Sequence, residues 1–395
     1  MPQPLHGIRV LDLSSVWAVP GTGMFLGDQG ADVIKIEPPK GDDGRRVLSM
    51  PPIRGESRAF WVVNRNKRSL VLDLRRPEGQ AVLHRLAAAA DVLLHNFRPG
   101  VDERLGIAYG TLRALNPRLI YVALTPYGAQ GRFRLARGYD LLVQAASGIL
   151  GRRKLADGKP RGAGMWAVDM STSMILGFAV ALALFQRERT GLGQRIEGSL
   201  LGSAIALQMV EMVQAREAGD DWPAADLGSQ AVFGAYACSD GTFVQLAVVN
   251  DQEWANLCAA LERPEWAGDA RFASYAARAQ HTEELARLLG EALAARPAAA
   301  WSERLLAHDA PAMAVLPPDA VFDSDPAQAN GMFVEVQQPG IGRVRMPGIP
   351  FRLSEGGAAR FRPAPRQGEH GDEVLREAGF SADEIQRLRA GKIVG

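Results

Sequence analysis

The sequence predicts an α/β protein in which a Rossmann-like large domain precedes a smaller α+β domain. In the first half of the chain, short runs rich in Val, Leu and Ile alternate with helical segments. Such runs are typical of a mostly parallel sheet that helices cover on both faces. Residues 217–226, in which charged residues, Gly and Pro cluster, predict a linker to a second region. The length of 395 residues also exceeds that of one ordinary core, so about two domains are expected.

Five runs of the first half are strand candidates because they are short and rich in β-branched and other apolar residues. They are residues 8–13, 32–37, 69–74, 91–97 and 119–124. Residues 76–90, between the third and fourth runs, predict a helix with Pro77 near its first turn and strong helix formers after it. We therefore assign residues 1–216 to the large domain.

A long apolar helix is predicted from Asp169 to about Glu188, where the glycine-rich residues 189–194 end it. Its apolar run, residues 174–185, has 12 residues, whereas a membrane span needs about 20. The run therefore predicts a buried helix of a soluble protein. A second helical stretch is expected over residues 197–216.

The smaller domain is expected over residues 227–328. Within it, residues 233–249 hold two β-type runs joined by residues 239–241, "SDG", which is a hairpin signal. Helical segments follow to about residue 308. Near the C-terminus, residues 381–384 carry the S-x-x-E spacing of a capping box and predict the start of a short helix.

The bulk composition narrows the function classes. With 47% hydrophobic and 23% charged residues, the chain is an ordinary globular protein. Its net charge of +1 gives no reason to expect nucleic acid or an anionic membrane as a partner. Two cysteines outside any CxxC spacing, and an N-terminus without the features of a signal peptide, favour a cytoplasmic protein. The six histidines form no pair at metal-ligand spacing, so no metal is expected.

A single carboxylate, Asp169, stands between a glycine-rich lead-in and the long apolar run, and two interpretations compete. Either Asp169 caps the helix that follows, or it performs chemistry in a pocket at the start of that helix. The two are compatible, because the helix dipole and backbone N–H groups that favour a capping carboxylate also keep it ionised for attack. Asp140, before another apolar segment, has the same capping interpretation.

Two groups of residues suggest a nucleotide-like ligand. Gly21, Gly23 and Gly27 follow the first strand, but their spacing is one residue longer than the dinucleotide fingerprint, so a nicotinamide cofactor is a weak alternative. Basic residues cluster around the third strand and after the fourth, where they favour a phosphorylated ligand over a merely solvated face. They are Arg65, Lys67, Arg68, Arg75, Arg76, Arg98 and Arg104. Hydrolase and nucleotidase motifs are missing from the sequence.

Several longer segments occur together in one order along the chain. They are "LHGIRVLDLSSVWAVPG", "GADVIKIEPPKGD", "NRNKRSLVLDLRRPEG", "ADVLLHNFRPGVDERLGI", "LNPRLIYVALTPYG", "GYDLLVQAASG", a "VD" before the long helix, and "GEHGDEVLREAGF". On this set the chain resembles the class III CoA-transferases, the CaiB/BaiF family, over nearly its whole length. The resemblance implies that residues 329–395 return to the large domain and that two chains form an interlocked homodimer.

The resemblance further implies an acyl-CoA:carboxylate CoA-transferase with Asp169 as its catalytic aspartate. The carboxylate attacks the thioester of an acyl-CoA to give an acyl-aspartyl anhydride, and CoA then forms an aspartyl thioester that an acceptor acid consumes. The implied partners are an acyl-CoA and a carboxylic acid. CoA acts as a substrate, and the reaction needs neither a metal nor a redox cofactor.

The resemblance also implies roles for the residues around this carboxylate. Those implied to bind CoA are Val16, Leu72, Arg75, Asn96, Phe97, Arg104 and Arg137, and those implied to shape the substrate pocket are Trp17, Tyr139 and Asp140. Pro38 departs from the pattern, because some relatives have an arginine there, and Lys40 or the basic cluster is expected to supply that contact. Trp17 replaces a small polar amide of the oxalate-specific members, so formyl-CoA:oxalate exchange is not expected.

Three alternatives stay open beside the transferase. The first is a 2-methylacyl-CoA racemase of the same fold, whose histidine in a "GHD" motif is replaced here by Tyr139. With a reference pKa of about 10, tyrosine is a poor general base, which disfavours racemisation. An NAD-dependent oxidoreductase is less favoured still. A CoA-binding protein without catalysis would be indifferent to Asp169→Ala. No motif identifies the donor acyl-CoA or the acceptor acid.

Overall fold

The computed structural model describes residues 1–46, 51–152, 155, 157–215, 217, 230–357 and 359–395. The chain divides into two compact units, one made of Met1–Val213 with Gly331–Gly395 and the other of Gln214–Asn330. Each unit has its own hydrophobic core. Of the predicted linker, residue 217 alone lies among the described residues.

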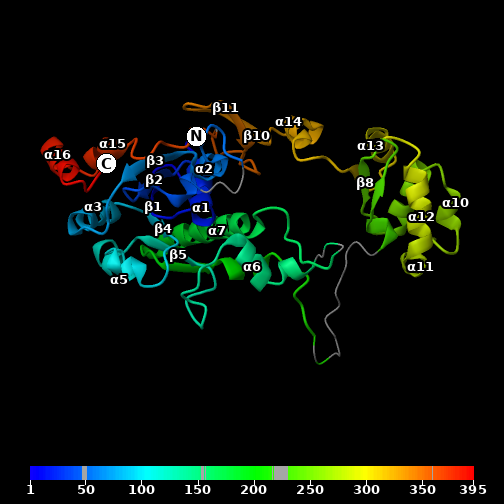
Figure 1. Cartoon of the computed structure of the whole chain (residues 1–395), viewed down its shortest axis with the longest axis horizontal. Helices are drawn as coiled ribbons and strands as arrows, with labels where there is room; N and C mark the ends of the chain where they lie inside the picture. The colour runs from blue at the N-terminus through cyan, green and yellow to red at the C-terminus, as the bar shows by residue number, and fades with distance from the viewer. Residues whose placement is uncertain (47–50, 153–154, 156, 216, 218–229, 358) are drawn as a thin grey trace. The chain divides into compact units, whose positions relative to one another are not determined.

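The first unit is built on a six-stranded sheet in the order β3-β2-β1-β4-β5-β6, in which every neighbouring pair is parallel (Figure 1). The strands are β1 (Arg9–Asp12), β2 (Asp32–Glu37), β3 (Lys67–Val71), β4 (Val92–His95), β5 (Ile120–Thr125) and β6 (Arg195–Ser199). The strand order reverses between β1 and β4. At such a point the connections leave the sheet in opposite directions, which opens a crevice outside the carboxyl ends of the strands.

The five predicted strands are all present, and the structure adds a sixth. Strand β3 begins at Lys67 rather than at residue 69, so two of the basic residues lie inside the sheet. The helix predicted over residues 197–216 is wrong at both ends: strand β6 occupies Arg195–Ser199, and within the described part of this stretch the helix covers Leu200–Ala206. This strand lies on the sheet edge with its residues half-buried or exposed, so it lacks the continuous apolar run of the others.

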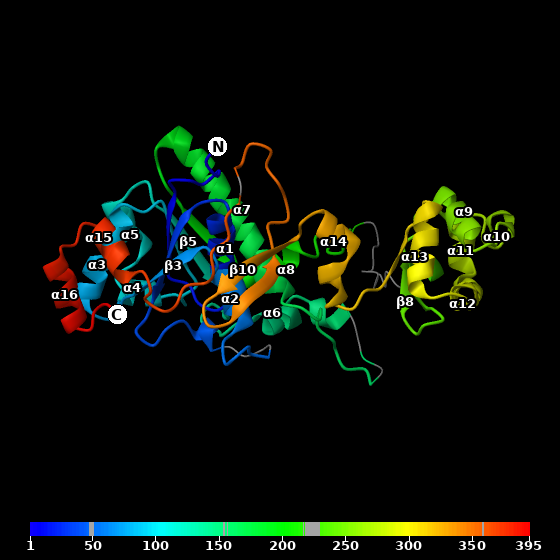
Figure 2. The same ribbon diagram turned by 90° about the horizontal axis from the view of Figure 1, so that it is seen from above.

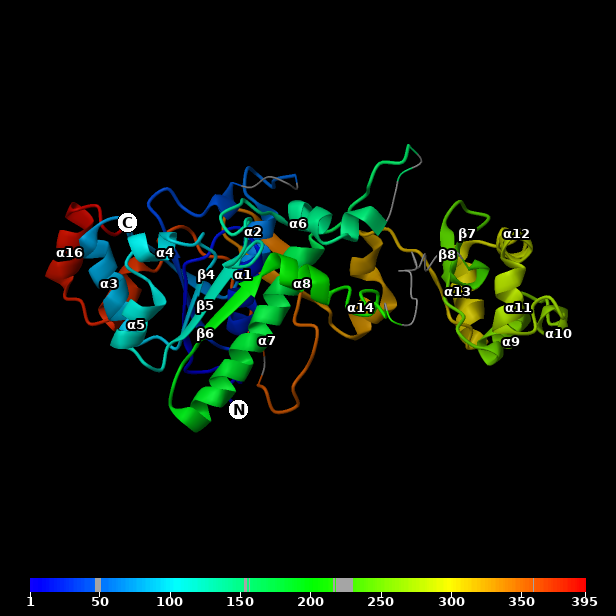
Figure 3. The same ribbon diagram turned by 90° about the horizontal axis from the view of Figure 1, so that it is seen from below.

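Helices cover both faces of the sheet, as its apolar strands predict. On one face, α1 (Ala18–Asp28) and α7 (Ala167–Thr190) share a core with Val10, Val33 and Val122. On the other face, four helices share a core with strand residues such as Leu11 and Leu93. They are α3 (Pro77–Ala88), α5 (Tyr109–Leu115), α15 (Gly371–Glu377) and α16 (Ala382–Ala390). Figure 2 shows these four gathered on one side, and Figure 3 shows α7 running beside β6.

The C-terminal segment completes the first unit. It forms an antiparallel hairpin of β10 (Phe333–Gln338) and β11 (Gly342–Pro347), and then α15 and α16. Leu72, just after β3, pairs with Val394 near the chain end. The capping box at the start of α16 is confirmed, because Ser381 and Glu384 make both of its reciprocal hydrogen bonds.

The first unit also contains short helical elements between and beside the strands. They are α2 (Arg58–Asn64), α4 (Val101–Arg104), α6 (Asp140–Ala146), α8 (Leu200–Ala206) and the 3₁₀ turns η1 (Asp43–Arg45) and η2 (Ile149–Arg152).

The second unit packs helices on a small antiparallel sheet. Its strands are β7 (Ala235–Ala237), β8 (Phe243–Leu246) and β9 (Ala312–Ala314), and its helical elements are η4 (Ala231–Phe233), α9 (Asp251–Ala260), α10 (Glu265–Gly268), α11 (Tyr275–Gln280), α12 (Thr282–Leu293), α13 (Ala298–Ala307), η5 (Ala320–Asp323) and α14 (Asp325–Ala329). The predicted hairpin is confirmed. In its turn, Gly241 takes a left-handed φ of 77°, and the Asp240 carboxylate accepts the Thr242 N–H.

The helix α7 differs from its prediction on one face. Its inner residues, such as Val168 and Val180, are buried against α1 and the sheet. Its outer apolar residues are exposed by between 51% and 66%: Met174, Phe178, Leu182 and Phe185. By length and composition this helix of 24 residues could cross a membrane, a test that core helices of soluble proteins also pass, and half of its most apolar window is buried. The helix predicted to be buried is therefore covered by its own chain on the inner face and exposed on the outer face.

Candidate active site

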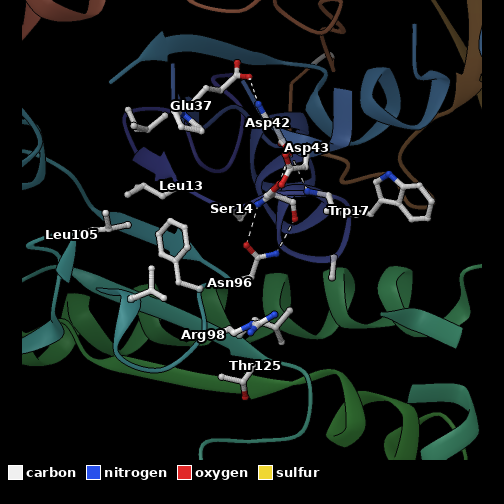
Figure 4. A pocket seen from close by; sticks show the side chains of 18 of the residues that line it. Leu13, Ser14, Trp17, Glu37, Asp42, Asp43, Asn96, Arg98, Leu105 and Thr125 are labelled. Carbon is white, nitrogen blue, oxygen red and sulfur yellow. Dashed lines mark hydrogen bonds between the residues drawn. The ribbon is translucent and has the colours of Figure 1, made fainter. Parts of the chain in front are cut away.

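A cavity of about 680 Å³ opens at the carboxyl ends of β1 to β5 in the first unit. Its lining comes from residues 13–18 after β1, 36–43 at the end of β2, 72–75 after β3, 96–105 after β4 and 124–126 at the end of β5. Residues 136–139, Asp169 and Leu200 complete it. Figure 4 shows side chains from these segments converging on one space. The cavity therefore lies where the strand order reverses, the usual ligand position in such sheets.

This cavity brings together all the predicted site residues except Asp140. Those in its lining are Val16, Trp17, Leu72, Arg75, Asn96, Phe97, Arg104, Arg137, Tyr139 and Asp169. Pro38, the position that departs from the family pattern, lines it too, beside Lys40.

Asp169 lies in the first turn of α7 and is 8% exposed. Among the described residues, no donor forms a hydrogen bond with its carboxylate. Burial, and to a lesser degree the negative charge of Asp140, raise the pKa of Asp169 to about 7. The sequence predicts that capping keeps this carboxylate ionised, and this prediction is wrong. With a pKa of about 7, a large part of Asp169 is protonated at neutral pH.

Asp140 performs the capping that the sequence suggested for Asp169. Its carboxylate Oδ2 accepts the N–H groups of Val168 and Asp169, both at 2.9 Å, although it precedes them by nearly thirty residues. Gln144, one turn further along α6, donates to Met165 O and accepts the Ala163 N–H. Asp140 is 1% exposed and lies outside the cavity lining, so its assignment to the substrate pocket is wrong. Its side chain instead fixes the start of α7.

Most of the basic cluster around β3 is used inside the fold and does not face a ligand. Arg65 pairs with Asp28 at 2.6 Å, Lys67 with Asp12 at 2.7 Å, and Arg68 with Asp32 at 2.7 Å. All three basic side chains are nearly fully buried. The prediction that this cluster binds phosphate is therefore wrong, apart from Arg75 at its end, which lines the cavity and pairs with Asp73.

The cavity still carries positive charge. Lys40 lines it and pairs with Asp43 at 3.0 Å. Arg98, Arg104 and Arg137 also line it, and within the described part of the chain none of these three has an ion-pair partner. Unpaired guanidinium groups suit phosphate oxygens, so the cavity can bind a phosphorylated ligand.

The glycines that suggested a nicotinamide cofactor lie inside α1. A side chain at Gly21 would collide with Ser173 of α7, since its Cβ would lie 2.3 Å from the Ser173 hydroxyl oxygen. Gly27 similarly approaches Asn66 and Val33. These glycines therefore serve close packing of α1, and none of them lines the cavity.

His95 supports a neighbour and does not act as a base. It is 2% exposed, and burial lowers its pKa to about 4, so the ring is neutral at physiological pH. Its Nδ1 accepts the Phe97 N–H at 3.2 Å, and the two rings stack with centroids 5.4 Å apart. The stack holds the Phe97 ring in the cavity wall.

Asp42 and Lys35 were missed by reasoning from the sequence. Asp42 lines the cavity and pairs with Lys35 at 2.6 Å, with both side chains almost fully buried. A signal was present, because Lys35 stands inside the apolar run of residues 32–37, and a charge within a buried strand requires a partner. In the part of the chain that the structure describes, no three His, Cys, Asp or Glu side chains gather at a metal-binding distance.

Known proteins share the sequence pattern and the fold of this chain. Residues 5–371 match CoA-transferase family III. The chain is 32% identical to the succinyl-CoA:glutarate CoA-transferase of Mus musculus, over 99% of this chain and 90% of that protein. It is 35% identical to the succinate–glutarate CoA-transferase of Agrobacterium fabrum, over 95% of each. Its fold superposes on the crystal structure of a CAIB/BAIF family protein from Brucella suis with a TM-score of 0.82, at 30% identity over 96% of this chain and 100% of that one.

The family match confirms the resemblance found in the sequence motifs, and the names of these relatives do not favour the racemase. The chain belongs to CoA-transferase family III and is an enzyme of the CoA-transferase type.

Proposed function

We propose that this enzyme moves CoA from an acyl-CoA to a carboxylic acid through covalent intermediates on Asp169. The supporting observation is the Asp169 carboxylate, which is buried and lines a cavity whose arginines suit the phosphates of CoA. Among the residues that the structure describes, this carboxylate has no hydrogen-bond donor and those arginines have no ion-pair partner. A carboxylate that protein donors do not stabilise is a stronger nucleophile than one they do, once it is ionised.

The reaction proceeds in two exchanges. Ionised Asp169 attacks the thioester carbonyl, and the C–S bond breaks to leave an acyl-aspartyl anhydride and CoA thiolate. The thiolate attacks the aspartyl carbonyl, which forms an aspartyl-CoA thioester and releases the donor acid as its carboxylate. An acceptor carboxylate then attacks this thioester, and the same steps in reverse release the new acyl-CoA and restore Asp169. Burial of Asp169 protects these intermediates from water.

The cavity residues divide between the two ends of the substrate. Arg98, Arg104 and Arg137 bind phosphate oxygens, and Arg98 or Lys40 supplies the contact that Pro38 does not make. Phe97 and Leu72 contact the adenine, and Trp17 and Tyr139 lie at the acyl end beside Asp169.

The donor that we propose is succinyl-CoA, with a dicarboxylic acid as acceptor, because two of the relatives are named for succinate and glutarate. The test is to incubate the enzyme with succinyl-CoA and single acids, among them glutarate, an aromatic acid and a carnitine-like acid, and to identify the acyl-CoA products by mass spectrometry. A new acyl-CoA with glutarate supports the proposal. A product with the aromatic acid alone rejects a dicarboxylate acceptor, and loss of α-proton label from a 2-methylacyl-CoA without exchange makes the enzyme a racemase.

The surroundings of Asp169 set the pH range of the reaction, through its burial first and the charge on Asp140 second. For the wild type, kcat/KM is expected to fall about tenfold per pH unit below a pKa of about 7, because Asp169 must be ionised in the free enzyme. Asp140→Asn keeps a carbonyl that accepts the N–H groups of Val168 and Asp169 but removes the negative charge, so the apparent pKa falls. Asp140→Ala removes the acceptor too and lowers kcat at every pH. A pH profile in Asp140→Asn that overlays the wild type contradicts this role.

We also propose that the enzyme acts as an interlocked homodimer of the CaiB/BaiF type. The outer apolar face of α7 supports this, because contiguous exposed apolar surface is typical of an interface between chains. Phe178 lies on this face and is 66% exposed. Phe178→Glu is expected to reduce the dimer fraction measured by light scattering, whereas Glu188→Gln on the same helix leaves it unchanged. A monomeric wild type contradicts the proposal.

A further inference from the structure

The turn between β1 and α1 has an unusual backbone. Val16 takes a φ of 70°, in the left-handed region. Branching at Cβ makes this conformation costly for valine, and such strain persists only where the surrounding structure imposes it. Of the described non-glycine residues with positive φ, Val16 alone is β-branched. It also lines the cavity, which connects the strain to the site.

Asn96 and Asp42 impose this turn. The Asn96 side chain uses both of its amide atoms on Ser15: its Oδ1 accepts the Ser15 N–H at 3.0 Å, and its Nδ2 donates to the Ser15 carbonyl at 2.8 Å. Asp42 Oδ1 accepts from the Ser15 hydroxyl at 2.5 Å and from the Val16 N–H at 3.3 Å. Figure 4 shows Asn96 below the turn with its two hydrogen bonds, and Asp42 above it. The turn is therefore held from two sides.

Lys35 fixes Asp42 in this position. Its Nζ lies 2.6 Å from Asp42 Oδ2 and donates to the Ser14 carbonyl at 3.0 Å. Burial alone would raise the pKa of Asp42, but the Lys35 ammonium holds it below the usual value. Both groups stay charged, and neither can leave without stranding the other. The pair therefore acts as a rigid support under the turn.

The residues that follow the Val16 turn contact the start of α7, where Asp169 lies. Trp17 follows Val16, and its ring meets that of Trp166, the residue before α7, with centroids 4.8 Å apart. Ala18 begins α1, and its carbonyl accepts the Ser173 hydroxyl of α7 at 2.6 Å. The start of α1 is thus docked on the first turns of α7, where Asp169 lies. A change in the Val16 backbone would move this junction.

We propose that Asn96, with the buried Lys35–Asp42 pair, is a positioning residue that holds Val16 in its left-handed turn and so places the start of α1 for acyl-CoA binding beside Asp169. This inference rests on the proposed function and adds the means by which the site is preorganised. Asn96 acts here through the Ser15 backbone, to which both of its amide atoms bond.

The test is a double-mutant cycle between Asn96→Ala and Val16→Gly. Glycine adopts positive φ without strain, so a turn with Val16→Gly needs less support. Asn96→Ala alone is expected to lower kcat/KM for the acyl-CoA by about tenfold, because release of the strain moves the turn. Combined with Val16→Gly, the same substitution is expected to cost about threefold or less. An equal loss in both backgrounds overturns the proposal, since it would mean that Asn96 contacts the substrate itself.

A matched control comes from Asn116, whose amide also bridges backbone groups. Its Nδ2 donates to the carbonyls of Ala87 and Ala90, and its Oδ1 accepts the Arg118 N–H, away from the cavity. Asn116→Ala is expected to show the same effect with and without Val16→Gly. If Asn96→Ala does not fold, Asn96→Asp keeps the acceptor for Ser15 N–H, removes the donor, and serves in the same cycle.

The affinity for CoA, measured by calorimetry across the same variants, separates this proposal from the proposed function. If neither the wild type nor any variant exchanges CoA, the proposed function is rejected. Coupling between positions 96 and 16 in CoA affinity would still support the role of Asn96 in holding the Val16 turn. If exchange proceeds and the effects of the two substitutions on kcat/KM and on CoA affinity are additive, the positioning role of Asn96 is rejected. The proposed transferase function is then unaffected.

Discussion

Asp169→Asn is expected to abolish CoA exchange while the variant still folds and binds CoA. The amide has nearly the shape of the carboxylate but is no nucleophile, so the expected loss in kcat is at least about 10³-fold. The structural cost is small, because no protein donor in the described chain holds the Asp169 carboxylate. The measurement is the initial rate of new acyl-CoA formation, together with CoA affinity by calorimetry.

The same substitution has a signature in stability. The folded protein raises the pKa of Asp169 from 3.8 to about 7, so it binds more protons than the unfolded chain between these values. The contribution of Asp169 to stability is full below pH 3.8 and is lost as pH rises through about 7. Asp169→Asn is therefore expected to melt above the wild type at pH 8. Asp372→Asn, on α15 and outside the cavity, is the control for activity. Exchange by Asp169→Asn at more than about 1% of the wild-type rate contradicts the mechanism.

Asp12→Ala is expected to destabilise the first unit by about 3–5 kcal/mol, the typical cost of breaking a buried ion pair. Lys67 is fully buried, and its Nζ donates to Asp12 Oδ2 and to Pro20 O, both at 2.7 Å. Burial lowers the pKa of Lys67 to about 8, even with Asp12 acting in the opposite direction. Without Asp12, the ammonium loses its counter-charge in the core. Urea unfolding at fixed protein concentration measures the difference.

An exposed pair provides the comparison. Glu78 pairs with Arg76 at 3.3 Å, with about half of each side chain exposed. Glu78→Ala is expected to cost less than about 1 kcal/mol, as exposed pairs do. A similar small cost for Asp12→Ala would show that Lys67 sheds its proton and needs no counter-charge.

The strand sequences predicted the large domain because they are buried on both faces. Residues 119–124 are apolar throughout, and residues 32–37 are apolar at positions 33, 34 and 36, as is typical of a covered parallel sheet. The edge strand β6 has one neighbour and half-exposed residues, so the pattern that identified the others does not apply to it. An apolar run does not reveal which of its faces the chain itself covers, so the sequence of α7 does not distinguish its exposed outer face from its buried inner face.

The contacts within the site could not be predicted from local sequence. The motifs placed Asp169 in the family pattern, but its environment depends on contacts that span long stretches of chain. The cap on α7 comes from Asp140, and the support under Val16 comes from Asp42 and Asn96. Local sequence favoured capping by Asp169 itself, since a carboxylate near a helix start usually has that role. The basic residues of β3 look like a ligand site in sequence, but they neutralise acids inside the fold.

Mass spectrometry of the trapped intermediate is the sharpest test of covalent catalysis by Asp169. The enzyme is incubated with succinyl-CoA without an acceptor, and its intact mass is recorded before and after treatment with hydroxylamine. The mechanism predicts a gain equal to CoA less water, replaced by a hydroxamate on the peptide that contains Asp169, and neither change in Asp169→Asn. An adduct on another residue, or exchange without any adduct, would contradict covalent catalysis by Asp169.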